Sequence, residues 1–358
     1  MTQTTERTPP QGNFFEDFRI GRRFLHPTPR TITQGDASLY IAFTGARQPV
    51  FSSAPLAVAT GYRELPIDDL LVFNIAFGKT VADISANAVA NLGYADIRFL
   101  AAVYPGDTIT SESEVIGLRP TSDGKAGVVY VRSTAHNQHG EPVLTWIRWV
   151  LVKKGDLAAA TPQTVVPDLP PMVEAANLPI PPLTPNIAAM ADATGCDRFW
   201  DDYAVGERID HPAGMTIDES DHTLATKLYQ NTAKVHFDAH LMKDTPHGRR
   251  LMYGGHVISV CRALSYDGLE NVLGMLAINA GSHSAPTFAG DTLYCFTEVK
   301  EKIEVAGRSD VGALRLRLVG IKNNPATGFV ATQEVDGKTR AHPAVVLDLD
   351  YTVLIPRA

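Results

Sequence analysis

The chain of 358 residues contains two related segments, one after the other. Residues 16–21 (EDFRIG) recur as residues 201–206 (DDYAVG), an offset of 185 (201 minus 16). Residues 104–109 (YPGDTI) recur as residues 288–293 (FAGDTL), an offset of 184 (288 minus 104). Two long copies whose offset stays nearly constant indicate a duplicated domain and exclude a short-period solenoid. Because both copies share one fold, a reactive residue that occurs in only one of them is a candidate for chemistry.

The bulk composition narrows the class of protein. A formal net charge of −7 gives no electrostatic support for nucleic-acid binding, and a hydrophobic content of 44% is ample for two packed cores. The 3 cysteines show no metal-type or redox spacing, which favours a reducing cytoplasm without structural disulfides. No apolar run approaches the length of a membrane span, and residues 1–12 lack the apolar core of a signal peptide. We therefore expect a cytoplasmic protein with neither a membrane nor a nucleic acid as partner.

A proline-rich stretch separates the two copies. Between about residues 155 and 195 the chain carries eight prolines, at positions 162, 167, 170, 171, 179, 181, 182 and 185. Proline at this density fixes the backbone and removes amide donors, so the stretch predicts an extended linker. The predicted organisation is an N-terminal domain at residues 1–155, a linker at 156–195 and a C-terminal domain at 196–358.

Each copy follows the same order of elements. Apolar segments near residues 69–81 and 255–267 predict one helix per half, and Val257, Val260 and Leu264 follow helical spacing. Long β-type segments come after the helix, at residues 127–135, 143–153, 291–305, 312–321 and 345–355. This order predicts an α+β fold in which each half wraps a curved antiparallel sheet around a long helix. The two halves can pair within one chain, and exposed sheet edges are also compatible with a homodimer.

Superposing the copies at the offset of 185 isolates a candidate site. His236 of the second copy meets Phe51 of the first, and Asn231 meets Ala46. Phenylalanine and alanine cannot move protons, whereas an imidazole titrates near neutral pH. The second copy is therefore predicted to carry acid–base chemistry, with the first copy forming an apolar wall through Phe51 and Ala46. The alternative for a single histidine is a structural role in the core.

Further candidates follow His236 along the chain. Asp238 comes two residues later, Arg249 and Arg250 form a basic pair, and Gly254 and Gly255 open the predicted helix. Free amides at a helix start, with glycines that allow close approach, can hold an oxyanion. The alternatives are a structural carboxylate, a solvated basic loop and a simple turn. His240, His247 and His256 match no common zinc spacing, so no metal is expected.

At these residues the chain resembles the MaoC-like, (R)-specific enoyl-CoA hydratases of the hot-dog fold. That family's signature reads D-x-N-P-x-H, with a later acid and H-G-M at the helix start. His236 falls on the signature histidine, Asp238 on the acid, and Gly254 on the glycine whose amide binds the oxyanion. The resemblance implies a tandem hot-dog fold and water addition to an acyl-CoA substrate without a cofactor. Asn231 departs from the pattern, because it stands where the family has its catalytic aspartate.

A narrower resemblance concerns the acyl group. Residues 68–73, 77–81, 87–96 and 235–240 look like the branch of that family that hydrates a carboxylated, methyl-branched enoyl-CoA. The resemblance implies His236, Asn231 and Gly254 as catalytic residues, and Asp238 and Gly255 as substrate-binding residues. Lys234, Arg249 and Arg250 are the nearest cations in sequence for the acyl carboxylate. Two other functions stay open, an acyl-CoA thioesterase and a non-catalytic acyl-CoA-binding protein.

Overall fold

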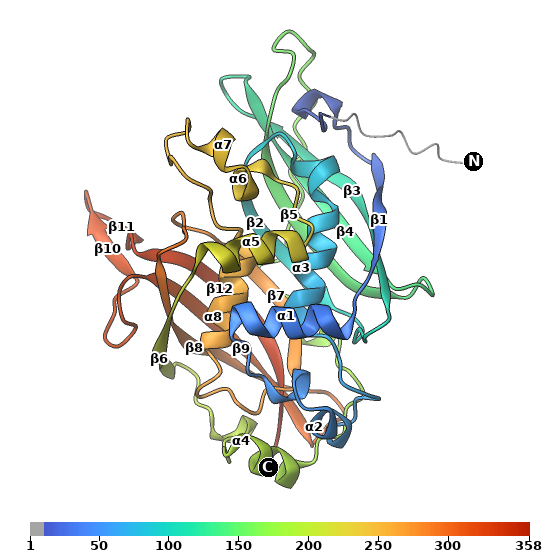
Figure 1. Ribbon diagram of the computed structural model, residues 1–358, viewed down its shortest axis with the longest axis vertical. Coiled ribbons are helices and arrows are strands. Elements are labelled where there is room, and N and C mark those ends of the chain that lie inside the picture. Colours follow the sequence, from blue (N-terminus) through green and yellow to red (C-terminus); the bar gives the residue numbers. More distant parts are fainter. Residues whose placement is uncertain (1–10) are drawn as a thin grey trace.

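The computed structural model describes residues 11–358 and is built around one antiparallel sheet of ten strands (Figure 1). The strand order is β1-β3-β4-β5-β2-β7-β12-β9-β8-β6, so each half of the sequence supplies one uninterrupted block of five strands. The sheet is continuous, but the two halves do not interleave. The strands are β1 (Arg23–Thr31), β2 (Ala88–Phe99), β3 (Thr108–Pro120), β4 (Ala126–His136), β5 (Pro142–Lys153), β6 (Arg208–Thr216), β7 (Gly274–Ser282), β8 (Thr292–Glu304), β9 (Val311–Lys322) and β12 (Val345–Pro356), with a separate hairpin of β10 (Thr332–Val335) and β11 (Lys338–Ala341).

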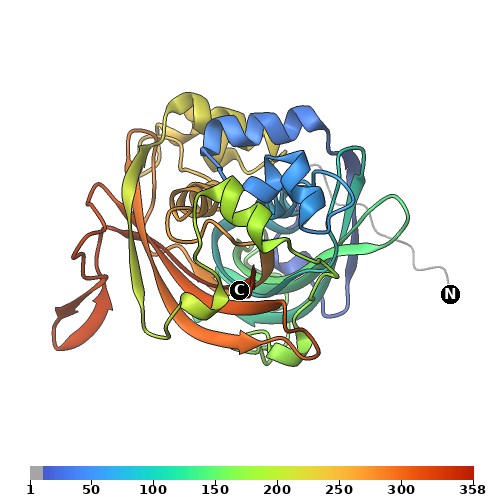
Figure 2. The ribbon, with the colours of Figure 1, turned by 90° about the horizontal axis from the view of Figure 1, so that it is seen from below.

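Two buried helices occupy the centre of the molecule, and the sheet curves around them (Figure 2). They are α3 (Asp69–Lys79) and α8 (Gly254–Leu264), close to the two predicted helices. Leu70 to Lys79 are all buried in α3, because this helix meets the sheet on one side and other helices on the other. The remaining helices are α1 (Gln34–Thr44), α2 (Ala54–Ala59), α4 (Ile187–Thr194), α5 (Glu219–Leu228), α6 (Lys234–Phe237) and α7 (Ala239–Met242).

The two halves are related by an approximate two-fold axis. Where the blocks meet, Ala95 of β2 lies opposite Ala280 of β7, and these positions are 185 apart (280 minus 95). Between the central helices, Asn74 Nδ2 donates to Ser259 Oγ at 3.0 Å, again across an offset of 185 (259 minus 74). Residues that are equivalent in the two copies therefore contact each other on the axis, which is the arrangement of a symmetric pair folded from one chain.

The proline-rich region is mostly irregular, but it is anchored to the body of the protein. Val173, Leu183 and Met190 are buried in one apolar cluster with residues of both halves. The helix α4 lies within this region and was not predicted. It begins directly after the last proline of the stretch, where the Asn186 side chain accepts a hydrogen bond from the Ala189 amide and caps the helix. The boundaries at 155 and 195 stay a prediction.

In the part of the chain that the structure describes, no helix is long and apolar enough to cross a membrane. Across residues 11–358, no three side chains of histidine, cysteine, aspartate or glutamate gather as a metal site would require.

Candidate active site

A cavity of about 370 Å³ lies between the two halves. The first half contributes the end of α3, the turn after it, β2 and β5. The second half contributes the segment before α8, the start of α8 and the segment after β7. The residues that line the cavity are Phe77, Val81, Ser85, Ala88, Val89, Ala90, Asn91, Tyr94, Arg148, Asn231, Ala233, Val235, His236, Met242, His247, Leu251, Met252, Tyr253, Gly254, Val257, His283, Ser284, Ala285, Pro286 and Thr287.

His236 lines this cavity from the short helix α6. Its Nδ1 is 2.8 Å from the carbonyl oxygen of Leu251, and a carbonyl only accepts, so Nδ1–H is the donor. The other ring nitrogen, Nε2, then carries a free lone pair. Burial lowers the pKa of His236 to about 4, which the Leu251 carbonyl offsets only in part. At neutral pH the ring is therefore uncharged, in the tautomer that can accept a proton at Nε2.

Asn231 lies beside His236 in the cavity wall and is 4% exposed. Its Oδ1 accepts a hydrogen bond from the Ala233 amide at 3.0 Å, which fixes the orientation of the side-chain amide. The Nδ2 group is left as a hydrogen-bond donor for the cavity. Where the wider family presents a carboxylate, this chain presents a donor that cannot take a proton.

Gly254 and Gly255 form the first turn of α8, where amides have no partner within the helix. Gly254 lines the cavity, and a Cβ at this position would lie 2.5 Å from His283 Nε2. Gly255 is buried behind it, where a Cβ would lie 2.0 Å from Asn74 Oδ1. Both positions exclude a side chain, and Gly254 is the one whose amide can reach a ligand.

The cavity also contains polar groups that the sequence did not single out. Tyr253 Oη, His283 Nε2, Arg148 Nε and both side-chain polar atoms of Asn91 are buried without a hydrogen-bond partner. Burial lowers the pKa of Arg148 to about 10, partly offset by the neighbouring hydroxyls of Tyr94 and Tyr253, so the guanidinium stays charged at neutral pH. Tyr94 and Arg148 lie opposite each other in β2 and β5. Only the register of these two strands could have indicated that both residues line the cavity.

Four other predicted residues do not line the cavity. Asp238 caps α7 by accepting from the Leu241 amide at 2.9 Å. The Arg249 guanidinium lies 4.1 Å above the Phe288 ring, Arg250 pairs with a carboxylate and donates to a threonine hydroxyl, and Lys234 is exposed at the start of α6. Their assignment to substrate binding stays a prediction from sequence proximity.

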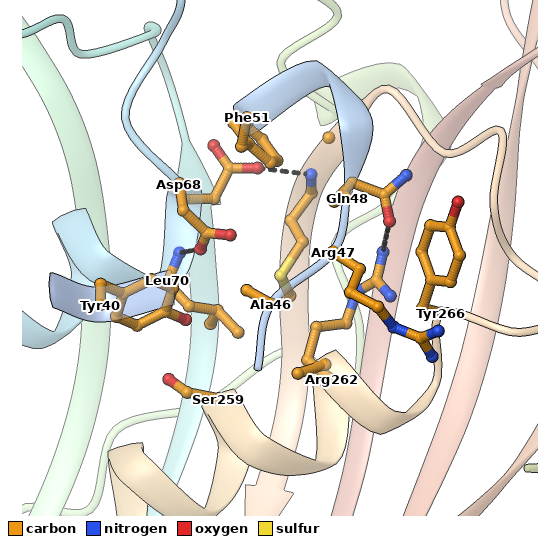
Figure 3. A pocket seen from close by; sticks show the side chains of 14 residues that line it. Tyr40, Ala46, Arg47, Gln48, Phe51, Asp68, Leu70, Ser259, Arg262 and Tyr266 are labelled. Atoms are coloured by element: carbon orange, nitrogen blue, oxygen red, sulfur yellow. Dashed lines mark hydrogen bonds between the residues drawn. The ribbon is translucent and has the colours of Figure 1, made fainter. Parts of the chain in front are cut away.

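A second, much smaller cavity of about 30 Å³ occupies the related position in the other half (Figure 3). Phe51, Ala46 and Asp69 line it, the equivalents of His236, Asn231 and Gly254. Phe51 and Ala46, which were predicted to form a wall of the acyl-CoA site, do not line the large cavity that contains His236. The two-fold axis places each motif beside the helix start of its own half, so they lie at the small cavity. The first half instead reaches the large cavity through α3, β2 and β5.

Comparison with known proteins identifies the family of this chain. The sequence profile of the mesaconyl-CoA hydratase family matches residues 2–335. The chain belongs to this family. A β-methylmalyl-CoA dehydratase from Chloroflexus aurantiacus is 53% identical over 97% of both chains. A mesaconyl-CoA hydratase from Cereibacter sphaeroides is 51% identical over 97% of this chain and 98% of its own.

Solved structures confirm the predicted fold of this family member. A MaoC domain dehydratase from Chloroflexus aurantiacus superposes with a TM-score of 0.93 at 52% identity, over 99% of this chain and 100% of its own. A Mycobacterium tuberculosis protein described as a double hot-dog fold superposes with a TM-score of 0.75 at 24% identity, over 96% of this chain and 99% of its own. The tandem hot-dog fold is thus confirmed.

Proposed function

We propose that this chain catalyses the reversible hydration of mesaconyl-CoA to β-methylmalyl-CoA. Two relatives, 53% and 51% identical over 346 residues, carry these activities in their names. The observation that carries the proposal is that His236, whose Nδ1 is held by the Leu251 carbonyl, lines the same cavity as Gly254, the first residue of α8. A base and an oxyanion donor in one site are what water addition to an unsaturated thioester needs.

The proposed reaction begins with the removal of a proton from water by His236 Nε2. The hydroxide oxygen bonds to the β-carbon, and the electrons of the double bond move to the thioester oxygen as an enolate. The Gly254 amide donates a hydrogen bond to that oxygen, a type of contact whose loss costs roughly 2.7–4 kcal/mol in other enzymes. His236 then returns the proton to the α-carbon, and the thioester carbonyl re-forms. Asn231 Nδ2 donates to the water oxygen and holds it before attack.

The lining of the cavity favours hydration over thioester hydrolysis. A hot-dog thioesterase needs a carboxylate that directs water at the carbonyl carbon. None of the described residues that line this cavity is an aspartate or a glutamate. The third possibility, a non-catalytic acyl-CoA-binding protein, does not require the precise tautomer that Leu251 imposes on His236.

Product analysis tests the proposal. Purified protein is incubated with mesaconyl-CoA, crotonyl-CoA and butyryl-CoA, and the products are identified by mass. We expect the mass of mesaconyl-CoA to increase by one water. Release of free CoA thiol from butyryl-CoA would instead establish a thioesterase, and no conversion of any substrate would establish a binding protein. We also propose a cytoplasmic homodimer, which light scattering and cell fractionation test.

A further inference from the structure

We propose that Arg148 of the first half binds the free carboxylate of the acyl group. The inference rests on the proposed function, since a carboxylated acyl group is what that function supplies. The half that lacks the catalytic histidine would then determine which acyl-CoA the enzyme accepts.

Arg148 is a buried cation without an anion. It lies in β5 and is 1% exposed. Its guanidinium donates to Thr80 Oγ1 at 2.8 Å and to Ser85 Oγ at 3.4 Å, and it stacks 4.2 Å from the centre of the Phe77 ring. Its Nε has no partner, and no carboxylate among residues 11–358 forms an ion pair with it. A buried charge is normally paired, so this one is complete only when an anion binds.

Two other sheet arginines show how this protein satisfies a guanidinium when no ligand is involved. Arg315 of β9 donates to both oxygens of Asp350, with the shortest contact at 2.7 Å. Arg317 bonds both oxygens of Asp348 at 2.8 and 2.9 Å. Arg148 is more buried than either, yet it has two hydroxyls where they have a carboxylate.

The charges around the cavity indicate the kind of ligand. Among the described lining residues, Arg148 is the only one with a permanent charge, and no lining residue is acidic. A single fixed positive charge in such a site favours a monoanion, and a guanidinium matches the two oxygens of a carboxylate. Next to it, Asn91 supplies further polar atoms without partners.

The position of Arg148 fits the chemistry at His236. The Phe77 ring under the guanidinium is 6.0 Å from the Tyr253 ring, and Tyr253 is 5.6 Å from the His236 ring. In mesaconyl-CoA the carboxylate is bonded directly to the β-carbon, which receives the hydroxyl. A carboxylate held by Arg148 therefore anchors the carbon that the water attacks.

The fold itself does not require a cation at this place. Val115 and Val299 are equivalent in the two copies, at an offset of 184 (299 minus 115). Two steps across paired strands lead from Val115 in β3, through β4, to Arg148 in β5. The same two steps lead from Val299 in β8, through β9, to Tyr351 in β12. The same buried position is thus neutral in the second half, so the pairing of the strands does not itself require an arginine there.

The test measures binding of two saturated analogues, which separates this inference from turnover. Methylsuccinyl-CoA carries the carboxylate, and 2-methylbutyryl-CoA has a methyl group in its place. In Arg148→Met we expect the Kd of methylsuccinyl-CoA to rise at least 50-fold and that of 2-methylbutyryl-CoA to change less than threefold. Arg148→Lys keeps the charge without the planar fork, so its loss should be intermediate and confined to the carboxylated analogue.

Arg132→Met is the matched control, because Arg132 is exposed on the neighbouring strand β4. It should bind both analogues as the wild type does. An equal loss of both analogues in Arg148→Lys, or no loss in either Arg148 variant, would overturn the inference. If the wild type binds methylsuccinyl-CoA through Arg148 but does not hydrate mesaconyl-CoA, the proposed function fails while the carboxylate subsite stands.

Discussion

The two related cavities differ about tenfold in volume, roughly 370 Å³ against 30 Å³, although the same fold builds both. At the large one, Gly254 leaves the helix start open. At the small one its equivalent is Asp69, whose Oδ2 accepts a hydrogen bond from the Met275 amide at 2.8 Å and closes the same space. The Phe51 ring stands where His236 stands in the large cavity. A few differences between the copies therefore accompany an open cavity in one half and a nearly filled one in the other.

Histidines that occur in both copies behave differently from His236. His26 and His211 are equivalent and buried, and each uses Nε2 to contact a hydroxyl of the next strand, Ser113 Oγ at 2.7 Å and Thr297 Oγ1 at 2.8 Å. Their shared contacts hold β1 and β6 to the sheet. The histidines common to both copies contribute to the fold, whereas His236, which occurs in one copy only, lines the large cavity.

The largest expected effect is that of His236→Ala on turnover. We expect kcat to fall at least 100-fold, because general acid–base catalysis contributes about 10²–10⁴-fold. The matched change Phe51→Ala should leave turnover measurable, although it removes a buried ring and lowers stability. Steady-state hydration of mesaconyl-CoA measures both. Equal losses in the two variants would show that the difference between the cavities concerns packing alone.

Gly254→Ala should lower kcat by roughly 100-fold, the order expected when a catalytic donor is misplaced by about 1 Å. The added Cβ would lie 2.5 Å from His283 Nε2, so either the helix start or the imidazole must move. Gly35→Ala in α1 is the control, because its Cβ would meet only Thr33 Oγ1 at 3.5 Å. Stopped-flow turnover compares the two, and unchanged kcat in Gly254→Ala would remove the oxyanion role.

Asn231→Asp should raise the KM for mesaconyl-CoA roughly tenfold and change that for crotonyl-CoA little. Oδ1 would keep its contact with the Ala233 amide, and the donor Nδ2 would become a second carboxylate oxygen facing the cavity. Two carboxylates in a poorly solvated site disfavour joint ionisation, which penalises only the carboxylated substrate. Steady-state kinetics with both substrates provides the measurement. The same change in both KM values would contradict this account.

The smallest expected effect concerns the closed cavity. Burial raises the pKa of Asp69 to about 8, above its value in the unfolded chain. The native state then keeps a proton that the unfolded state loses, so Asp69 reduces stability progressively as pH rises from about 4 to 8.

Asp69→Asn removes that penalty, and we expect its Tm to exceed the wild-type Tm by a few degrees at pH 8 and by little at pH 4.5. Thermal melts at both pH values measure the difference, with the exposed Asp244→Asn as control. Hydration activity should not change, since Asp69 lies outside the large cavity. A Tm difference that is independent of pH would show that Asp69 is ionised in the folded protein.

Local sequence patterns determined the parts of this protein that depend on neighbours along the chain. Apolar runs and strand-like segments located α3, α8 and five of the strands, β4, β5, β8, β9 and β12, since helix and strand periodicities are local properties. They did not locate β2, β3 or β7. Comparison of the copies selected His236 and Asn231, and both line the cavity. The helix α4 was not predicted, because the prolines before it indicate an extended chain. The Asn186 side chain, directly after the prolines, caps the helix and allows it to begin there.

Only the tertiary structure decided which cation faces the cavity. Arg249 and Arg250 are near His236 in sequence but interact with Phe288 and Glu219, while Arg148 reaches the cavity from the other half. That placement depends on the register between β2 and β5 and on the contact between the two halves across β2 and β7, because a shift of one residue would turn the arginine to the opposite face of the sheet. Such long-range pairing leaves no trace in the order of residues along the chain.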